Sequence, residues 1–474
     1  MTEKRTLFFK LACLGCLLLT VACTGRDQYD QPISGELPAS IIPYYAGAVG
    51  APQYEDLLKS SKQNVSVRVG MLLPLTGKSK RLGEELRNAG MLAQFDLAND
   101  QLVLQFYDTK GTPEGAREAF EKAKADHVQL ILGPVFADEV KAVRKSSGRI
   151  PIISFTSDTD SVGDGVYTMA LLLTQQTERI IRHACDQKKT RLAIMAPDNK
   201  AGDIAIETAR KTAAACGMEV TRLAVYNPTF INFEPYVLSV LPDSFAGKKK
   251  YADEKKKEKK TEKEKNEIPV AEQLDFDALF IADDGNRLKS IAALFGLYDV
   301  TPREVMFLGM STWYEPSLTN EGALLGGRFS ALPSSGFETF SAKYKETYGR
   351  TPVRLASLAY DAVALASVLP QTLGLTEESL TNARGFIGTD GLFRLRKDGS
   401  SERLLGVLQI AGKNNFRVVE EPAASFEEEA FMKEHMSDIQ ILNAYREQQR
   451  LARERLRQEM ERLQAASETT PVQE

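Results

Sequence analysis

The sequence has few of the residues that usually carry enzymatic chemistry, and its charges nearly cancel. It contains three histidines in 474 residues: His127, His183 and His435. No nucleophile elbow, Walker loop or paired metal motif occurs, so we expect no enzymatic activity and no cofactor. The formal net charge of −4 at pH 7 argues against nucleic acid as a partner, because nucleic-acid-binding domains carry a clear excess of positive charge.

Long apolar runs are missing beyond the amino-terminal segment, so no later part of the sequence predicts a membrane-spanning helix. The amino end combines Lys4, Arg5 and Lys10 with an apolar stretch over residues 11–22. About 12 apolar residues cannot span a bilayer, which needs roughly 20. Residues 1–22 therefore predict an export signal that is removed from the mature chain.

Cysteine is scarce, and Cys23 directly follows this apolar stretch. The tripeptide TVA at 20–22 places a small residue before the thiol and resembles the bacterial lipoprotein signal, although Leu19 lies one residue earlier than the family's leucine. The resemblance implies cleavage before Cys23 and acyl chains on its sulfur, which anchor well because each buried methylene contributes about 0.8 kcal/mol. Thr24 implies sorting to the outer membrane, facing the periplasm. An ordinary secretory signal with an unmodified cysteine is the alternative.

Only two cysteines, Cys185 and Cys216, follow Cys23 in the sequence. The periplasm permits disulfides, and both residues lie near the ends of predicted helices, so a bridge between them is geometrically feasible. We expect two buried free thiols and keep the bridge as the alternative.

Strands and helices alternate from residue 65 onward. The preceding residues 23–64 hold proline, glycine, serine and tyrosine without a regular period and predict a tether. The first block contains the apolar runs VSVRVGMLLPL, LVLQFYD, VQLILGP and IPIISF, separated by helical patterns. This alternation predicts βαβ units with a parallel sheet, and the nearly continuous apolar strands predict helices on both faces.

The same alternation restarts after the stretch SVGDGVYTMAL and includes the runs RLAIMAPD, MEVTRLAVY, FDALFIADD and VMFLGM. Two such blocks predict an α/β protein with two doubly wound, Rossmann-like lobes and a cleft between them. In doubly wound sheets, ligands bind at the carboxyl ends of the strands.

The remaining segments depart from this alternation. Residues 246–268 are rich in lysine with interleaved acids and predict a disordered, solvated insertion, with a patch that binds phosphate or cell wall as the alternative. Residues 354–369 predict an apolar helix, and 391–410 predict a hairpin that turns at KDGS. Residues 425–468 predict a charged amphipathic helix that packs on its own domain or projects freely, with pairing or partner binding as alternatives. Residues 469–474 predict a disordered tail.

Several stretches of the body resemble type I periplasmic binding proteins, the Leu/Ile/Val-binding class. VRVGMLLPLTGKSKRLGEELRNAGMLA is similar to their first βα unit, LILGPVFADEV to the third strand and its loop, and IPIISFTSDTD to the strand that enters the cleft. The resemblance covers residues 66–420 and implies that the chain crosses between the lobes three times. The first lobe would then take about 66–160 and 310–370, and the second about 165–305 and 375–420.

A narrower resemblance concerns one branch of this class. DTKGTPEGAREAFEKA and SVGDGVYTMALLLTQQTERIIRHA, together with the lipoprotein signal, resemble penicillin-binding protein activators of alphaproteobacteria. These are lipoproteins that stimulate a cell-wall synthase from the outer membrane. The resemblance implies a class A penicillin-binding protein as partner and a membrane anchor on Cys23. The lysine-rich insertion and the long carboxyl-terminal tail depart from the pattern of this branch.

The wider resemblance also implies a candidate ligand cleft. In the amino-acid-binding proteins, hydroxyls and backbone amides of three loops hold the ligand's carboxylate, and an acid holds its ammonium. Phe136 and Ala137 stand where the relatives usually carry serine or threonine, which weakens zwitterion binding because a buried carboxylate needs donors. The candidate cleft residues are Thr76, Gly77, Phe136, Ala137, Ser154, Thr156, Ser157, Asp158, Asp198, Asp283, Asp284, Trp313 and Tyr314.

Structural roles compete with these cleft assignments. The loop residues could cap helices and line a wet cleft without a ligand, and Asp283 and Asp284 could cap the following helix. Trp313 and Tyr314 could face a partner or pack between the lobes. Two functions follow as hypotheses. The first is activation of a peptidoglycan synthase by protein contact. The second is a lipid-anchored substrate-binding protein for branched-chain amino acids or amides, with an ABC permease as partner.

Overall fold

Three β-sheets and the helices around them make up the part of the chain that the structure describes. The computed structural model describes residues 66–245, 274–332, 334–372, 374–435 and residue 458. The predicted export signal, Cys23 with its predicted acyl chains, the predicted tether, the lysine-rich insertion, the predicted tail and most of the predicted helix over 425–468 lie outside these residues. Within them, no helix combines the length and the apolar character that crossing a bilayer requires.

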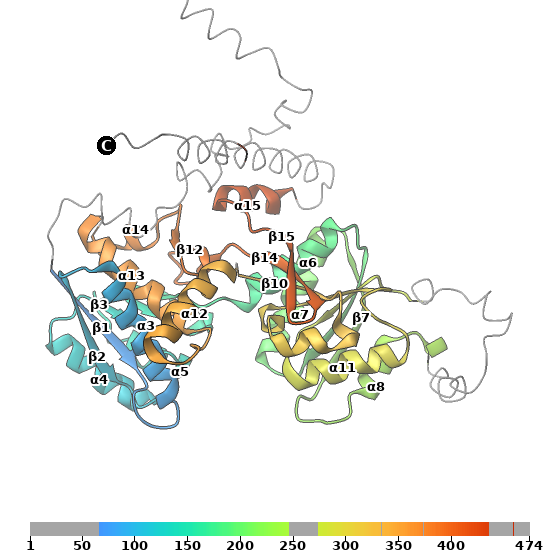
Figure 1. Ribbon diagram of the computed structural model, residues 1–474, viewed down its shortest axis with the longest axis horizontal. Coiled ribbons are helices and arrows are strands. Elements are labelled where there is room, and N and C mark those ends of the chain that lie inside the picture. The colour runs from blue at the N-terminus through green and yellow to red at the C-terminus, as the bar shows by residue number, and fades with distance from the viewer. Residues whose placement is uncertain (1–65, 246–273, 333, 373, 436–457, 459–474) are drawn as a thin grey trace, which may run out of the picture. The chain divides into compact units, whose positions relative to one another are not determined.

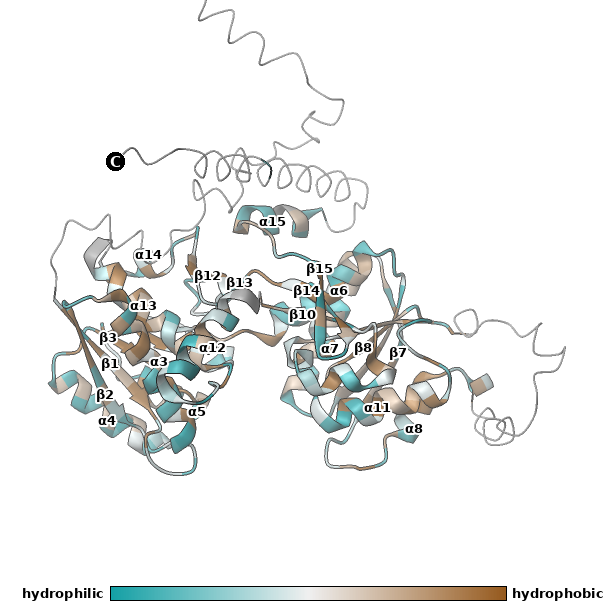
Figure 2. Cartoon of the chain, in the orientation of Figure 1, coloured by the Kyte–Doolittle hydropathy of each residue, from teal (hydrophilic) through white to brown (hydrophobic). Residues whose placement is uncertain are grey.

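The first sheet has five parallel strands in the order β2-β1-β3-β4-β5 (Figure 1). The strands are β1 (Val67–Leu73), β2 (Leu102–Asp108), β3 (Leu130–Leu132), β4 (Ile152–Ser154) and β5 (Val166–Thr168). Helices α3 (Lys80–Leu97), α12 (Ser334–Tyr348) and α13 (Ala356–Thr372) share one apolar core with this sheet. Helices α4 (Pro113–Ala125) and α5 (Ala137–Arg144) share a second core with it. Figure 2 shows hydrophobic ribbon along β1, β3 and α13.

The second sheet has seven strands in the order β15-β14-β10-β9-β8-β6-β7. The strands are β6 (Arg191–Pro197), β7 (Glu219–Tyr226), β8 (Ala278–Ile281), β9 (Met306–Gly309), β10 (Arg328–Ala331), β14 (Gly406–Gly412) and β15 (Asn415–Glu420). The first five are parallel and the last two antiparallel. Helices α6 (Leu173–Asp186) and α7 (Lys200–Ala215) share one core with this sheet. Helices α8 (Glu234–Val240) and α11 (Gly285–Leu297) share another.

A small antiparallel sheet is formed by residues that lie between β10 and β14 in the sequence. It contains β11 (Phe386–Gly388), β12 (Gly391–Leu395) and β13 (Ser401–Arg403) in that order. The predicted hairpin that turns at KDGS is therefore confirmed for β12 and β13. The short helix α14 (Glu377–Leu380) precedes this sheet in the sequence, and the short helix α15 (Phe426–Glu434) follows β15.

The two-lobed α/β class expected from the sequence is confirmed, but some segments belong to the other lobe. Strand β5 pairs with β4, so the first lobe extends past the expected end at residue 160. The segment 310–331 was assigned to the first lobe, yet β10 pairs with β9 in the second sheet. Residues 386–395 were assigned to the second lobe, yet Phe386, Phe393 and Leu395 are buried in the first lobe's core. Strand pairing and core packing, which local sequence patterns do not encode, decide these placements.

Cys185 and Cys216 form a disulfide, with their Cα atoms 6.3 Å apart. Cys185 lies in the last turn of α6, and Cys216 is the residue that ends α7. The two helices pack in one core against the second sheet, which brings their carboxyl ends together. The expectation of two free thiols is therefore wrong, and the alternative that the sequence left open is correct.

Candidate ligand site

The loop after β1 is fixed by a single carboxylate at the end of β2. Asp108 accepts hydrogen bonds from the Thr76 hydroxyl (2.6 Å), from the Thr76 and Leu75 backbone amides (3.2 and 2.9 Å) and from the Lys110 amide (2.8 Å). Burial raises the pKa of Asp108, but these donors outweigh it and the pKa lies below its usual value. Gly77 has φ +78°, and a Cβ there would lie 2.9 Å from the Lys110 carbonyl oxygen. The Thr76 hydroxyl is thus already engaged.

The loop after β3 carries the phenyl ring of Phe136 at the start of α5. The Phe136 backbone amide donates to Oε2 of Glu139 at 3.1 Å, and Ala137 is the first residue of the helix. Burial raises the pKa of Glu139, in spite of the hydrogen bonds that it accepts. The Phe136 ring packs against the first lobe's core. Neither the Phe136 nor the Ala137 side chain offers a hydrogen-bond donor.

The end of β4 and the loop after it contribute three hydroxyls with different surroundings. Ser154 is fully buried and its hydroxyl donates to the Tyr167 carbonyl oxygen at 2.8 Å. The Thr156 hydroxyl is nearly buried and accepts a hydrogen bond from the Asp158 amide at 3.1 Å. Ser157 is exposed. Ser154 therefore stabilises the β4–β5 pair, while Thr156 shapes the loop and Ser157 faces solvent.

Asp158 is held by lysines from both lobes. Its Oδ1 lies 2.5 Å from the Nζ of Lys200, the first residue of α7, and its Oδ2 lies 3.3 Å from the Nζ of Lys141 on α5. Lys200 also contacts Asp160 at 2.8 Å. Burial raises the pKa of Asp158, but the two lysines outweigh it and the pKa lies below its usual value. Asp158, one of the acids of the candidate cleft, therefore already meets two ammonium groups of the protein.

In the second lobe, Asp283 follows β8 and is almost fully buried. Its carboxylate accepts a hydrogen bond from the Tyr226 hydroxyl at 2.5 Å and two from Arg287 at 2.7 and 2.8 Å. Burial and the bond to Asp283 raise the pKa of the Tyr226 hydroxyl, so it remains a donor. Asp284 occupies the N-cap position of α11, as the structural alternative predicted, although its side chain makes no capping hydrogen bond. These contacts tie β7, β8 and α11 together.

The two aromatic candidates are packing residues. Trp313 is fully buried, its Nε1–H donates to the Asp283 carbonyl oxygen at 3.0 Å, and its ring leaves no room for a Cβ at Gly309. The half-buried Tyr314 ring lies 4.7 Å from the ring of Phe416 on β15. The alternative that these residues pack between the lobes is therefore wrong, because Trp313 lies in the second lobe's core and Tyr314 packs against the same core.

The structure thus brings the first-lobe candidates to the carboxyl ends of neighbouring parallel strands, as predicted. Asp198 follows β6, is exposed, and its backbone amide donates to the Tyr226 carbonyl oxygen at 2.7 Å. Across the described residues, no group of three or more His, Cys, Asp or Glu side chains could hold a metal ion. The arrangement offers hydroxyls, backbone amides and paired charges, which suit binding.

A family model for periplasmic binding proteins matches residues 66–384 of this chain. The chain belongs to the periplasmic binding protein family. Its match extends over both lobes, from β1 to the segment before β11, and includes the loops described above. No curated protein matches the chain in sequence.

Solved structures of periplasmic binding proteins share the fold. A candidate branched-chain amino acid ABC transporter from Rhodospirillum rubrum has a TM-score of 0.60 at 20% identity, covering 75% of this chain and all of that one. A branched-chain amino acid periplasmic ligand-binding protein from Burkholderia xenovorans has a TM-score of 0.57 at 14% identity, covering 77% and 96%. A substrate-binding protein from Sphaerobacter thermophilus has a TM-score of 0.56 at 17% identity, covering 77% and 99%.

Sequence reasoning missed the partners that occupy the candidate site. Asp108, Lys141 and Lys200 hold Thr76 and Asp158, and Tyr226 and Arg287 hold Asp283. One signal was available, because Asp108 is the last residue of a predicted strand and Lys200 stands just after another. The identity of each partner was not available, since residues 42 positions apart meet only when two lobes are placed together.

A recess of about 450 Å³ opens elsewhere, at the β12–β13 turn. Its cationic side chains are largely engaged, since Arg394 pairs with Glu402 at 2.6 Å and donates to the Ala383 carbonyl oxygen at 2.9 Å. None of the predicted cleft residues lines it. Its lining consists of Thr381, Ala383, Arg394, Leu395, Arg396, Lys397 and Asp398.

Proposed function

We propose that this periplasmic binding protein works by binding, and that its role is to capture a small solute for an ABC importer. The match of the family model over both lobes carries the proposal, and the named structural relatives include transport proteins for branched-chain amino acids. The candidate loops support it, because they meet at the carboxyl ends of parallel strands, where doubly wound sheets bind ligands. The ligand class that follows is a branched-chain amino acid or an amide.

The site's charges restrict how such a ligand binds. An amino acid's ammonium would compete with Lys200 for Asp158, and its carboxylate would find the Thr76 hydroxyl engaged by Asp108. An aliphatic amide that lacks the amino group avoids the first competition. We therefore expect such amides to bind more tightly than amino acids with the same side chain.

Thermal-shift measurements on the full mature chain test this proposal. A ligand present at 100 times its dissociation constant adds about 2.7 kcal/mol to the free energy of unfolding. A panel of branched-chain amino acids and of branched aliphatic amides without an amino group should contain at least one compound that raises the melting temperature. A panel without any stabilising compound, repeated at millimolar concentration, would contradict the solute-binding role.

A second candidate is activation of a class A penicillin-binding protein through protein contact, from a lipid anchor on Cys23 in the outer membrane. The observation that favours it is the Asp158 network, which joins the two lobes through the protein's own charges without a ligand. The phenyl ring of Phe136 in the second loop and the activator-like sequence stretches support the same candidate. A binding partner of this kind acts by favouring the active conformation of the synthase.

Photo-crosslinking in intact cells separates the two candidates. Crosslinkers at exposed positions of both lobes should capture a class A synthase if the activator role holds, and an ABC permease if the transport role holds. Mass spectrometry of the same protein tests the anchor, which predicts acyl chains on Cys23. An unmodified Cys23, or binding assays without affinity for any class A synthase, would contradict the activator role.

A further inference from the structure

The nine-residue helix α15 contacts elements of both lobes. At its first residue, Phe426 is buried in an apolar cluster with Leu392 and Leu404. The guanidinium carbon of Arg394 lies 4.0 Å above the centre of the Phe426 ring. Leu392 and Arg394 belong to β12, and Phe393 of the same strand is buried in the first lobe's core. The amino end of α15 is therefore attached to the first lobe.

The middle of α15 is attached to the second lobe. Oε1 of Glu429 lies 2.6 Å from Nη2 of Arg182, whose side chain is 1% exposed. Arg182 lies on α6, and the neighbouring Ile180 and Ile181 are buried in a core of the second sheet. Burial raises the pKa of Glu429, but the charge of Arg182 outweighs it and the pKa lies below its usual value. Breaking such a buried pair is costly, because it leaves an uncompensated charge.

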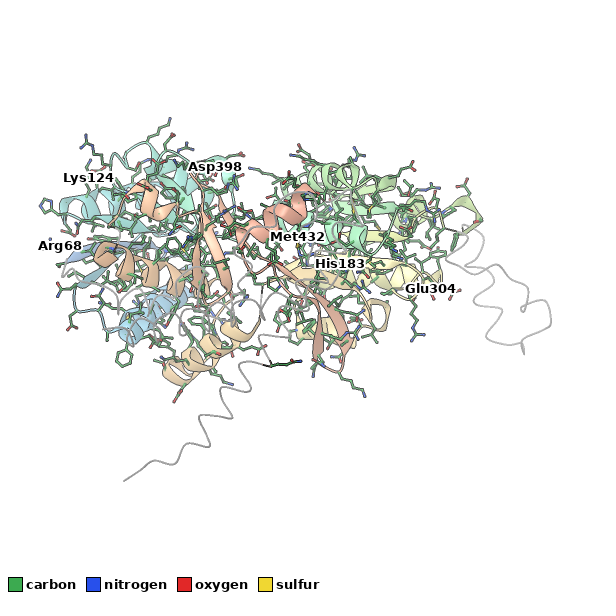
Figure 3. The ribbon with its side chains drawn as sticks, turned by 90° about the horizontal axis from the view of Figure 1, so that it is seen from above. Arg68, Lys124, His183, Glu304, Asp398 and Met432 are labelled. Carbon is green, nitrogen blue, oxygen red and sulfur yellow. A yellow bond between two sulfur atoms is a disulfide. The ribbon has the colours of Figure 1, made fainter. Side chains whose placement is uncertain are left out.

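Lys433, one turn further along α15, reaches both lobes at once. Its Nζ lies 3.2 Å from a carboxylate oxygen of Glu178 on α6 and 3.6 Å from one of Glu402 on β13. Figure 3 marks the three elements, with Met432 on α15, His183 on α6 and Asp398 at the β12–β13 turn.

The elements that α15 contacts also form hydrogen bonds with two of the segments in which the chain crosses between the lobes. Arg403 at the end of β13 donates to the Met169 carbonyl oxygen at 2.9 Å. The Ser401 hydroxyl donates to the Ala170 carbonyl oxygen at 2.6 Å. Arg179 of α6 donates to the Leu405 carbonyl oxygen at 2.8 Å. The helix is thus attached on both sides of the place where the chain passes between the lobes.

We propose that α15 is a clasp that fixes the angle between the two lobes, and that releasing it allows the angle to change. This role is independent of whether the protein delivers a solute or activates a synthase.

Distance measurements between spin labels test the clasp. The full mature chain in detergent carries one label at Lys124 in the first lobe and one at Glu207 on α7 in the second, attached through non-canonical residues so that the disulfide stays intact. Removing two charges with Glu429→Gln and Lys433→Gln should broaden or shift the distance distribution. The same variant should speed hydrogen exchange of α15 by about tenfold. Phe426→Ala, which acts through packing, should give the same change.

Glu427→Gln is the matched control, because Glu427 is exposed on the same helix, and it should give the wild-type distribution. Circular dichroism confirms that each variant is folded, and the single variant Lys433→Gln replaces the double variant if that fails to fold. An unchanged distance distribution while α15 exchanges freely would overturn the clasp. Unchanged exchange of α15 in the charge variants would overturn it as well, since the ion pairs would then not hold the helix.

Discussion

The Nζ of Lys200 lies 2.5 Å from Oδ1 of Asp158 and joins the first turn of α7 in the second lobe to the loop after β4 in the first. Lys200 is largely exposed, whereas Asp158 is mostly buried. The pair therefore joins the two lobes through charges of the protein itself. The two proposed functions differ at this pair. Capture of an amino acid requires its ammonium to displace Lys200 from Asp158, whereas activation of a synthase does not.

Replacing Lys200 with glutamine should free Asp158 for a ligand's ammonium. The melting temperature should change little, because exposed ion pairs contribute little to stability. If the protein binds solutes, branched-chain amino acids should then raise the melting temperature more than in the wild type. Lys211→Gln, at an exposed position on the same helix, is the control. Equal responses of the wild type and Lys200→Gln across the panel would show that Asp158 does not receive a ligand.

Tyr226→Phe should destabilise the second lobe without affecting ligand binding. The variant removes the hydroxyl that donates to the buried Asp283 carboxylate, and a hydrogen bond to a charged group contributes about 1.5–3 kcal/mol. Urea unfolding measures the loss. Tyr236→Phe is the control, since its ring packs edge-on against Tyr226 and no hydrogen bond of its hydroxyl is among the described contacts. If Tyr226→Phe lowers the free energy of unfolding less than the control does, the hydrogen bonds from Arg287 alone are sufficient for the Asp283 carboxylate.

Reducing the Cys185–Cys216 disulfide should lower the free energy of unfolding. The bridge spans a sequence separation of 31 residues, and closing a loop of that length stabilises by about 3–4 kcal/mol in the chain-entropy model. Guanidinium unfolding with and without reductant measures the change. The double variant Cys185→Ala with Cys216→Ala should not respond to reductant, and a response as large as that of the wild type would place the effect elsewhere.

Asp361 on α13 should make stability fall as the pH rises towards neutral. Burial first, and then the nearby Asp390 carboxylate, raise the pKa of Asp361 from 3.8 to about 7, although Arg403 and hydrogen bonds from Thr389 oppose this. The folded protein therefore keeps a proton that the unfolded chain loses above 3.8. Its contribution to stability is fully present below that value and is lost as the pH rises through about 7.

Asp361→Asn removes this titration. The difference in unfolding free energy between the variant and the wild type should grow with pH across this range and level off above it. Asp203→Asn, at an exposed position on α7, should show no such trend. A constant difference for Asp361→Asn would mean that Asp361 keeps the same charge throughout the range.

The sequence predicted the helices and strands of the two parallel blocks well, because each strand is a short apolar run and each helix has an apolar face. The strands β1, β2, β6 and β7 coincide closely with the runs identified from the sequence. The strand β10 and the helix α12 did not emerge in the same way. The apolar residues of β10 are few, and α12 reads as a polar segment with scattered aromatics.

The sequence also identified the loops of the candidate site. It could not show whether the side chains of these loops already have partners within the protein. Thr76, Asp158 and Asp283 were singled out because polar residues after strands face the sheet edge where ligands bind. That each is already engaged, by Asp108, by Lys200 and by Tyr226 with Arg287, follows only from distances between segments far apart in the chain.

The amino-acid sequence by itself determined the fold class, the order of the two blocks and the absence of recognisable catalytic motifs, because periodicity and residue chemistry are local properties. Only the tertiary structure decided the disulfide, the lobe to which β10 and the β11–β13 hairpin belong, and the attachment of α15 to both lobes. The physical reason is that strand pairing, burial and ion pairing depend on which distant segments come into contact. The residues that make those contacts lie far apart in the sequence, so no local pattern reveals that they interact.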